Sequence, residues 1–409
     1  MKKTYLFPVL GLLVVFAVVF AAGCTGTTTD TTGNSDVVEV VEIAAGQQIN
    51  SLALNQVDGI INWQPNVAAA TVSGVGKVIS YSQDLPRSDG KTWSEHTCCV
   101  FGANEDGLKN KELATVLTGL MLLGNQYIID YPDEAATAVA NWMYGNTDPT
   151  FGSSTVKAID IIKTSLPTIK FSTELTDTWK DSTYEFVETQ RALGTVVNNL
   201  KSTSREETEA LLYDFDPYYA AKKVIDEKGT FTEPVSGKIT IGSLRSDHDS
   251  PLYVLLKNWE YFKDTYNTYL KPSSSSSTVG PVSDAELYVN GKKICDVEVV
   301  EGSGGPNIMT LLQTGQAQYA IAGAPPFISS IDTRTGIKIL SPIMTEGSGF
   351  LVSSKASVNT WDEFAAWAKQ SSAEGKNLVV AVPQYNSIQD VMLKYALESS
   401  GLTYVKKTV

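Results

Sequence analysis

The chain has few of the residues on which metal centres, disulfide scaffolds and nucleic-acid interfaces depend. Its 409 residues include only two histidines and four cysteines, and 32 basic side chains stand against 45 acidic ones. Two histidines leave little room for a histidine-rich metal centre, and four irregularly spaced cysteines do not make a disulfide scaffold. A net charge of -13 argues against binding to nucleic-acid phosphates. The composition favours an acidic globular protein long enough for two or three domains.

The first residues have the pattern of an export signal. Lys2 and Lys3 precede an apolar stretch over residues 5–20, and small residues lead up to Cys24. The apolar stretch is short for a transmembrane helix, which crosses about 30 Å of hydrocarbon. The small residues resemble a lipoprotein processing site, although Ala21 stands where that motif usually has leucine.

This pattern predicts where the protein is anchored. We expect residues 1–23 to be a lipoprotein signal peptide and Cys24 to become the lipidated first residue. Residues 24–37, rich in threonine, then form a flexible tether. Two acyl chains are enough for stable anchoring, so we expect an extracytoplasmic location on the outer face of the cell membrane.

Beyond the tether, short apolar runs alternate with amphipathic stretches. This alternation is typical of an α/β fold with largely parallel sheets. It predicts strand and helix pairs at residues 58–63 and 66–72, 237–241 and 252–269, 317–322 and 326–331, and 378–382 and 387–399. Long helical stretches are expected over residues 110–146 and 174–212, a hairpin over residues 285–301, and a linker over residues 227–237.

One helix-to-strand unit occurs twice. Residues 308–322 (IMTLLQTGQAQYAIA) resemble residues 49–61 (INSLALNQVDGII), each with an amphipathic helix, a polar turn and a strand. Two similar lobes would explain the likeness. A coincidence of ordinary helix-to-strand patterns is the alternative.

Several longer motifs resemble one known family. From Gly237 onward the chain contains GKITIGSLRSDHDSPLYV, GGPNIMTLLQTGQAQYAIAGAPP, TEGSGFLVSS and VAVPQYNSIQDVMLKYALESSGL. These segments are similar to the first half of substrate-binding proteins of the nitrate/sulfonate/bicarbonate transporter family. Residues 38–226, with QINSLALNQVDGIINWQPN and HTCCVFGANEDGLKNKEL, are similar to its second half. The resemblance implies a periplasmic-binding-protein-like fold, with two α/β lobes, a hinge and an interlobe cleft.

The two halves stand in reversed order. Joining Val409 to about Val38 restores the family pattern, so the chain resembles a circular permutant, cut in one strand and closed through residues 227–237. A fragment of a tandem array and a domain-swapped dimer are the alternatives. Permutation predicts a continuous lobe I over residues 98–349 and a lobe II assembled from residues 38–97 and 350–409. The crossovers between lobes are expected near residues 96–100 and 345–350.

A binding protein of this design needs polar groups where strands end at the cleft. Two loops before helices supply candidates, because helix-terminal amides hold anions or carbonyl oxygens and glycines allow close approach. These loops predict Ser303, Gly304, Asn386, Ser387 and Gln389 as ligand-binding residues. The resemblance adds Trp63, Gln64, His96, His248, Ala324, Pro325, Thr345 and Ser348. Capping, turn formation or core packing is the alternative role for each of them.

The glutamine at position 64 narrows the class of ligand that we expect. Relatives often carry Asp or Glu at this position, and a carboxylate would suit the ammonium group of an aminosulfonate. A glutamine supplies no such charge. A taurine-like ligand is therefore disfavoured, whereas an oxyanion, another sulfonate or a related small organic solute fits the resemblance.

The adjacent cysteines have two further interpretations. Cys98 and Cys99, together with the histidines, would be soft metal ligands, but they lie on separate loops without a ligand spacing, so we expect packing and no metal. The CCVF segment is also similar to the cysteine cluster of thiamine-pyrimidine synthases. Those enzymes hold pyridoxal phosphate on a lysine near a histidine, and here Ala322 and Pro326 occupy those places. Without the lysine no Schiff base forms, so we expect no enzyme and no cofactor.

The resemblance implies a solute-binding lipoprotein. We expect it to capture a small solute in its cleft and deliver it to the permease and ATPase subunits of an ABC importer. A ligand-sensing lipoprotein, or a binding protein for a thiamine-precursor pyrimidine, is the alternative within the same fold.

Overall fold

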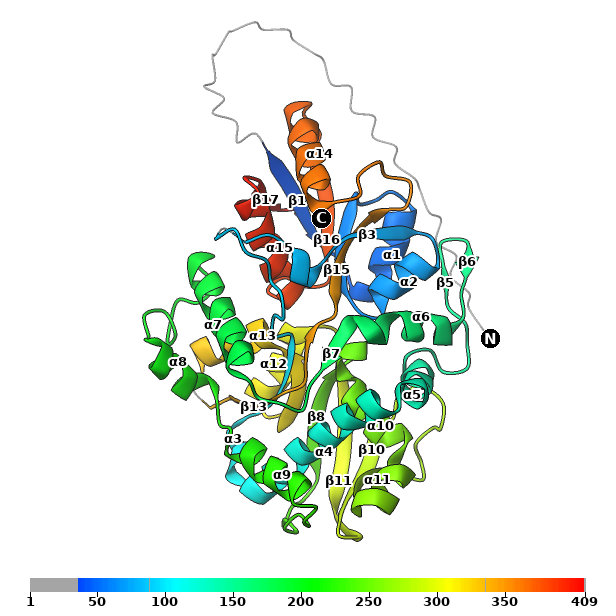
Figure 1. Ribbon diagram of the computed structural model, residues 1–409, viewed down its shortest axis with the longest axis vertical. Helices are drawn as coiled ribbons and strands as arrows, with labels where there is room; N and C mark the ends of the chain where they lie inside the picture. Colours follow the sequence, from blue (N-terminus) through cyan, green and yellow to red (C-terminus); the bar gives the residue numbers. More distant parts are fainter. Residues whose placement is uncertain (1–35, 88, 335, 408–409) are drawn as a thin grey trace, which may run out of the picture. The chain divides into compact units, whose positions relative to one another are not determined.

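The computed structural model describes residues 36–87, 89–334 and 336–407. They form an α/β structure, as the alternation of apolar runs and helical stretches predicts, but both large sheets mix parallel and antiparallel strands and are not largely parallel as expected (Figure 1). The proposed signal peptide, Cys24 and most of the tether lie outside the described residues.

One sheet collects strands from both ends of the described chain (Figure 1). Its strand order is β17-β1-β16-β2-β15-β3. The middle strand β2 is buried at every position, as its apolar sequence GIINW requires. The strands are β1 (Val37–Glu42), β2 (Gly59–Trp63), β3 (Gly76–Tyr81), β15 (Ser348–Ser353), β16 (Leu378–Val382) and β17 (Thr403–Lys406).

A second, seven-stranded sheet has the order β13-β4-β12-β8-β11-β10-β9. β8 runs parallel to β11 and β12, and β4 runs antiparallel to β12 and β13. β4 and β8 are buried throughout, which explains their apolar sequences. The strands are β4 (Cys99–Ala103), β8 (Ile239–Leu244), β9 (Thr268–Pro272), β10 (Asp284–Val289), β11 (Lys292–Gly302), β12 (Tyr319–Gly323) and β13 (Lys338–Pro342).

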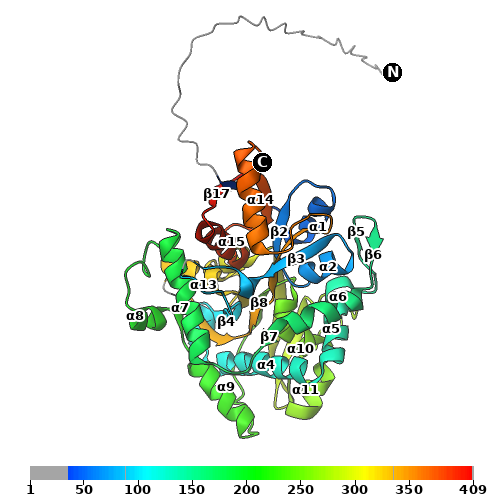
Figure 2. The ribbon, with the colours of Figure 1, turned by 45° about the horizontal axis from the view of Figure 1, so that its top comes forward.

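Helices cover both sheets, and α4 packs against α9 and α10 beside the seven-stranded sheet (Figure 2). The helices are α1 (Ala45–Ala53), α2 (Asn66–Val72), α3 (Glu105–Lys109), α4 (Lys111–Asp130), α5 (Pro132–Tyr144), α6 (Ala158–Ser165), α7 (Asp177–Ala192), α8 (Arg205–Leu212), α9 (Asp216–Asp226), α10 (Ser250–Lys257), α11 (Trp259–Tyr266), α12 (Gly305–Gln313), α13 (Ala324–Thr333), α14 (Trp361–Ala373) and α15 (Ile388–Ser399). Short strands complete the fold: β5 (Thr150–Phe151), β6 (Ser154–Thr155), β7 (Ile169–Phe171) and β14 (Met344–Glu346).

Most predicted elements are present, with three interruptions. The stretch 110–146 divides at Tyr131 because Pro132 disfavours a helical conformation in the residue before it. The stretch 252–269 divides at Asn258, and the stretch 174–212 divides after Ala192. Among the described residues, α4 is long and apolar enough to cross a membrane, but most of it is buried in the fold.

The sequence predicts that the two chain ends are the halves of one cut strand, but in the structure they form two separate strands. β17 and β1 are neighbouring parallel strands, with Thr403 opposite Val37 and Lys406 opposite Val40. Each segment is rich in β-branched or aromatic residues and forms a strand of its own. The end of β17 therefore lies beside the interior of β1 and not beside its start, so a direct junction to residue 38 would have to run back along the sheet.

Two antiparallel segments carry the chain between the sheets. Thr97 pairs with Thr345, the Glu346 amide donates to the His96 carbonyl at 3.1 Å, and the Cys98 amide donates to the Met344 carbonyl at 3.2 Å. These segments lie in the stretches where crossovers between two lobes are expected, and the division into lobes stays a prediction. Their mutual hydrogen bonds fix the start of β4 relative to the start of β15.

We expect Gly102→Ala to destabilise the fold strongly. A Cβ at this position in β4 would lie 2.6 Å from the Lys338 carbonyl oxygen and would also clash with the Phe327 ring. Overpacking of this kind costs about 1–3 kcal/mol or more. Gly46→Ala in α1 is the matched control, because a Cβ there meets no atom within 4 Å and alanine favours the helix. Urea denaturation of the two variants measures the difference, and an equal effect of both would contradict the packing of β4.

Candidate functional site

A small enclosed cavity lies where several strands end. Its volume is about 20 Å³, which is room for about one water molecule. Trp63 ends β2, Leu244 ends β8 and Gly323 ends β12, so the cavity lies at the carboxyl edges of these strands. Cys99 begins β4, but this strand is antiparallel and Cys99 stands opposite Gly323. The lining residues are Trp63, Cys99, Leu244, His248, Gly305, Gly323, Pro326, Ser387, Ile388 and Gln389.

Three helices begin at this cavity. The first residues of α12 and α15, Gly305 and Ile388, line it, and Gly323 is the residue before α13. Free backbone amides and the helix dipole give such ends a partial positive charge. Among the described residues that line the cavity there is no lysine or arginine. Any attraction for an anion must therefore come from backbone and neutral donors.

Two side chains on the wall have unused hydrogen-bonding groups. The buried indole Nε1 of Trp63 has no acceptor within the described part of the chain. Gln389 donates from Nε2 to Ser348 Oγ at 2.9 Å, whereas its Oε1 has no donor there. A buried unpartnered polar atom is costly, and such atoms in a cavity are candidates for ligand contacts.

His248 is oriented by one strong contact. Its Nε2 lies 2.7 Å from the carbonyl oxygen of Gly347, which only accepts, so Nε2 carries the proton. The other nitrogen, Nδ1, faces Cys98 Sγ at 3.5 Å and Cys99 Sγ at 3.7 Å. The hydrogen bond to Cys98, together with burial, raises the pKa of the Cys99 thiol well above its usual value. The Cys99 thiol therefore keeps its proton at neutral pH.

The loop that carries His248 is also acidic, but burial reduces its charge. Burial raises the pKa of Asp247 to about 7, and the hydrogen bond from Ser165 opposes this shift. Burial also raises the pKa of Asp249 well above its usual value. Both carboxyl groups are thus more protonated than ordinary aspartates, which lowers the negative charge beside the cavity.

Gln64 links this loop to the six-stranded sheet but does not line the cavity. Its carbonyl oxygen accepts from the Asp247 amide at 3.1 Å and from Ser246 Oγ at 3.0 Å. Its side chain accepts from the Ala68 amide and donates from Nε2 to Thr168 Oγ1 at 2.9 Å. The Gln64 side chain therefore stabilises the start of α2 and its contact with Thr168.

The structure brings four of the predicted binding residues to the cavity, namely Trp63, His248, Ser387 and Gln389. Ser387 also caps α15 by accepting from the Asp390 amide at 3.3 Å. Gly304, Ala324, Pro325 and Ser348 are next to or bonded to lining residues. The role of all these residues in ligand binding stays a prediction.

The other predicted residues do not line the cavity, although Asn386 directly precedes Ser387. Ser303 and Asn386 are exposed, and Thr345 pairs with Lys170 in the short β14–β7 sheet. His96 is buried with its Nε2 2.8 Å from Ser82 Oγ, and burial lowers its pKa to about 4. His96 is therefore a neutral packing residue in this structure.

Sequence reasoning missed six lining residues as ligand contacts. Gly305, Gly323 and Pro326 belong to the predicted loops, but each is one position from a chosen residue. The positions at which α12 and α13 begin would have identified them. Cys99, Leu244 and Ile388 are apolar or weakly polar, so no local pattern distinguishes them from core residues.

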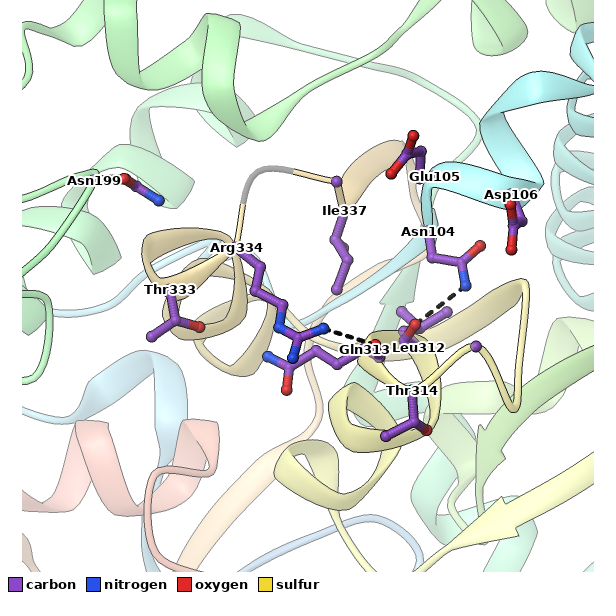
Figure 3. A pocket seen from close by; sticks show the side chains of 12 residues that line it. Asn104, Glu105, Asp106, Asn199, Leu312, Gln313, Thr314, Thr333, Arg334 and Ile337 are labelled. Atoms are coloured by element: carbon purple, nitrogen blue, oxygen red, sulfur yellow. Dashed lines mark hydrogen bonds between the residues drawn. The ribbon is translucent and has the colours of Figure 1, made fainter.

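A larger polar pocket of about 560 Å³ lies at the opposite edge of the seven-stranded sheet (Figure 3). Asn104 follows the end of antiparallel β4 and donates to the carbonyls of Leu312 and Ala317. Arg334 donates to the Gln313 carbonyl at 2.9 Å. These polar groups already serve internal contacts, and the pocket lies away from the carboxyl edges of the parallel strands. It is therefore a weaker candidate than the small cavity.

Comparison with known proteins identifies relatives of this chain. The profile of the NMT1-like family matches residues 233–409. The chain is 38% identical over 109 residues to the uncharacterized protein MJ1180 of Methanocaldococcus jannaschii. That alignment covers 26% of this chain and 71% of the relative. No solved structure is significantly similar to the chain.

We expect Gln64→Glu to destabilise the protein at pH 7 by about 2 kcal/mol. Thr168 Oγ1 already donates its proton to the Ser165 carbonyl, so it cannot donate to a carboxylate at position 64. The loss should shrink near pH 4.5, because a protonated glutamic acid can donate to Thr168 Oγ1. Chemical denaturation at both pH values measures this, with exposed Gln56→Glu as the charge-matched control. A loss that does not depend on pH would contradict the assigned hydrogen bonds.

Proposed function

The chain belongs to the NMT1-like family, and on this premise we propose that it captures a small anionic or carbonyl-bearing solute in the described cavity. The family's members generally are extracytoplasmic solute-binding proteins that serve ABC importers and carry out no catalysis. Delivery to a permease with its ATPase, and anchoring through a lipidated Cys24, are parts of the same proposal.

The arrangement of the cavity carries this proposal. Trp63 and Gln389 come from the six-stranded sheet and the helix that follows one of its strands. Leu244 and Gly323 end strands of the seven-stranded sheet. A binding site formed from the ends of two sheets is accessible when the sheets separate and enclosed when they approach. The observed cavity is too small for a polyatomic solute, so binding requires a wider separation than this one.

The hydrogen-bond donors that line the cavity support the proposal of an anionic or carbonyl-bearing solute. Three helix amino ends and the free indole N–H of Trp63 favour an oxygen-bearing group, and neither lysine nor arginine is among the described lining residues. A neutral glutamine at position 64, turned away from the cavity, leaves no carboxylate for an ammonium group. Oxyanions and sulfonates without an amine are therefore the first candidates.

We infer that two lobes close about the paired connecting segments. In this proposal lobe I spans residues 98–349, and lobe II combines residues 38–97 and 350–409. The antiparallel contact between Thr97 and Thr345 would be the hinge. The reversed order of the halves supports a circular permutation, and the pairing of β17 with β1 within one chain favours closure in a monomer.

A reordered chain tests the permutation. We expect residues 237–407, a flexible linker of about eight residues and residues 36–226 to fold in this order as a monomer. The linker is needed because the end of β17 and the start of β1 are about 10 Å apart along the strands, from the three intervals of about 3.3 Å between four registered residues. Circular dichroism and size-exclusion chromatography are the measurements. An unfolded product, or a dimer, would contradict closure within one chain.

Thermal shift and tryptophan fluorescence test the solute. We expect one class among oxyanions, sulfonates and pyrimidines to raise the melting temperature, since a ligand at 100 times its Kd adds about 2.7 kcal/mol of stability. Trp63→Phe keeps an aromatic side chain but replaces the indole with a smaller phenyl ring that has no N–H donor, so the affinity should fall about five- to tenfold. Trp367→Phe, which does not line the cavity, should bind normally. If no solute in any class shifts the melting temperature, the proposed capture is wrong.

A further inference from the structure

Cys98, Cys99 and His248 form a compact cluster of soft ligands at the cavity wall. The two sulfur atoms and one ring nitrogen all lie within 4.8 Å of one another, and the three residues are between 0% and 2% exposed. The proposed solute capture needs neither thiol. Core packing alone does not explain why both adjacent thiols face the same imidazole nitrogen.

The spacing of these atoms suits a bound ion. Zinc bonds of about 2.3 Å to sulfur and 2.0–2.1 Å to nitrogen place two ligands of a tetrahedral ion about 3.6 Å apart. The two sulfur-to-Nδ1 distances are 3.5 and 3.7 Å. Both sulfur-to-nitrogen distances therefore match those around a tetrahedral ion, and the two sulfur atoms lie within 4.8 Å of each other.

The orientation of His248 also suits a ligand. Metal-binding histidines usually donate their second ring N–H to a carboxylate or a backbone carbonyl, which fixes the tautomer. Here Nε2–H donates to the Gly347 carbonyl at 2.7 Å, and the free lone pair of Nδ1 is turned to the thiols. A single lone pair cannot accept well from two S–H groups, whereas one ion would satisfy all three residues.

The charges of the three ligands favour a divalent ion, because the site is buried. Two thiolates and a neutral imidazole cancel the charge of Zn²⁺, so the complex as a whole is neutral and suits burial. Each thiol releases one proton to solvent as the ion binds. The cavity, lined by Cys99 and His248, leaves room for about one water as a fourth ligand.

We propose that Cys98, Cys99 and His248 bind a thiophilic divalent ion of the zinc class, with its fourth position open to the cavity. This assignment rests on the geometry of the three side chains and does not depend on the proposed solute. The sequence pattern predicts packing for these residues. Their proximity is visible only in the fold, which brings the loop after β8 beside the start of β4.

Cobalt substitution tests the site directly. The full chain with Cys24→Ser is stripped with a chelator, kept reduced with a phosphine and titrated with Co²⁺ alone. We expect one Co²⁺ per chain, thiolate-to-cobalt charge-transfer absorption and the visible bands of tetrahedral Co²⁺. Stoichiometric Zn²⁺ should then displace the cobalt and abolish the colour.

Variants of the chain assign the ligands. We expect Cys98→Ala, Cys99→Ala and His248→Gln each to weaken Zn²⁺ binding at least 100-fold, whereas Cys295→Ala keeps full binding because this buried cysteine lies elsewhere in the sheet. A folded protein without the charge-transfer absorption would overturn the proposal even if every variant misfolded. Unchanged binding in the cluster variants, or loss in Cys295→Ala, would overturn it as well. No solute is added, so this result and the outcome of the solute screen are independent.

Discussion

The carbonyl group of Gly347 is the contact on which the arrangement of the site depends. It accepts one hydrogen bond from the Gln64 amide at 3.0 Å and another from His248 Nε2 at 2.7 Å. Gln64 directly follows β2 of the six-stranded sheet, and His248 lies in the loop after β8 of the seven-stranded sheet. Gly347 itself lies between the strands that carry the chain from sheet to sheet. One peptide group therefore fixes three segments at once.

The local backbone explains why a glycine occupies this position. Gly347 has a φ of +80°, and a Cβ there would lie 2.7 Å from His248 Nε2 and 2.9 Å from the terminal methyl of Met344. Any side chain would push the imidazole away from the carbonyl that orients it. The preceding residue, Glu346, is also left-handed and accepts from Lys170 and from the Glu95 amide. The tight turn is therefore stabilised by buried polar contacts on both sides.

Much of the fold could be predicted from the sequence, because periodicity and turn residues are local. β2, α2 and α15 lie close to their expected bounds, and Ser387 has the capping role that was one of its alternatives. The relation between β17 and β1 was not predictable, since both segments fit the same family strand and only pairing in the sheet distinguishes them. At the site, Ser387 was a candidate because it precedes a predicted helix, whereas Trp63 was a candidate through the family resemblance.

The cysteine and histidine cluster shows why other parts of the site could not be predicted. Cys99 and His248 are 149 positions apart, and no ligand spacing connects them. They meet because β12 pairs with β4 on one side and with β8 on the other, which brings the start of β4 to the edge where β8 ends. A sequence motif depends on the number of residues between ligands, whereas the proximity of these ligands depends on the order of the strands in the sheet.

The same strand order keeps the proposed binding of an ion separate from the proposed entry of a solute, although both involve the cavity. Cys98, Cys99 and His248 all belong to the seven-stranded sheet and its adjoining segments, so they stay together in the proposed opening of the lobes. The contacts from the Asp247 amide and Ser246 Oγ to the Gln64 carbonyl cross between the sheets and must break. Opening therefore exposes Trp63 and Gln389 to a solute while the ion ligands keep their mutual distances. An ion at this site would act as a fixed part of the wall, toward which the other sheet closes.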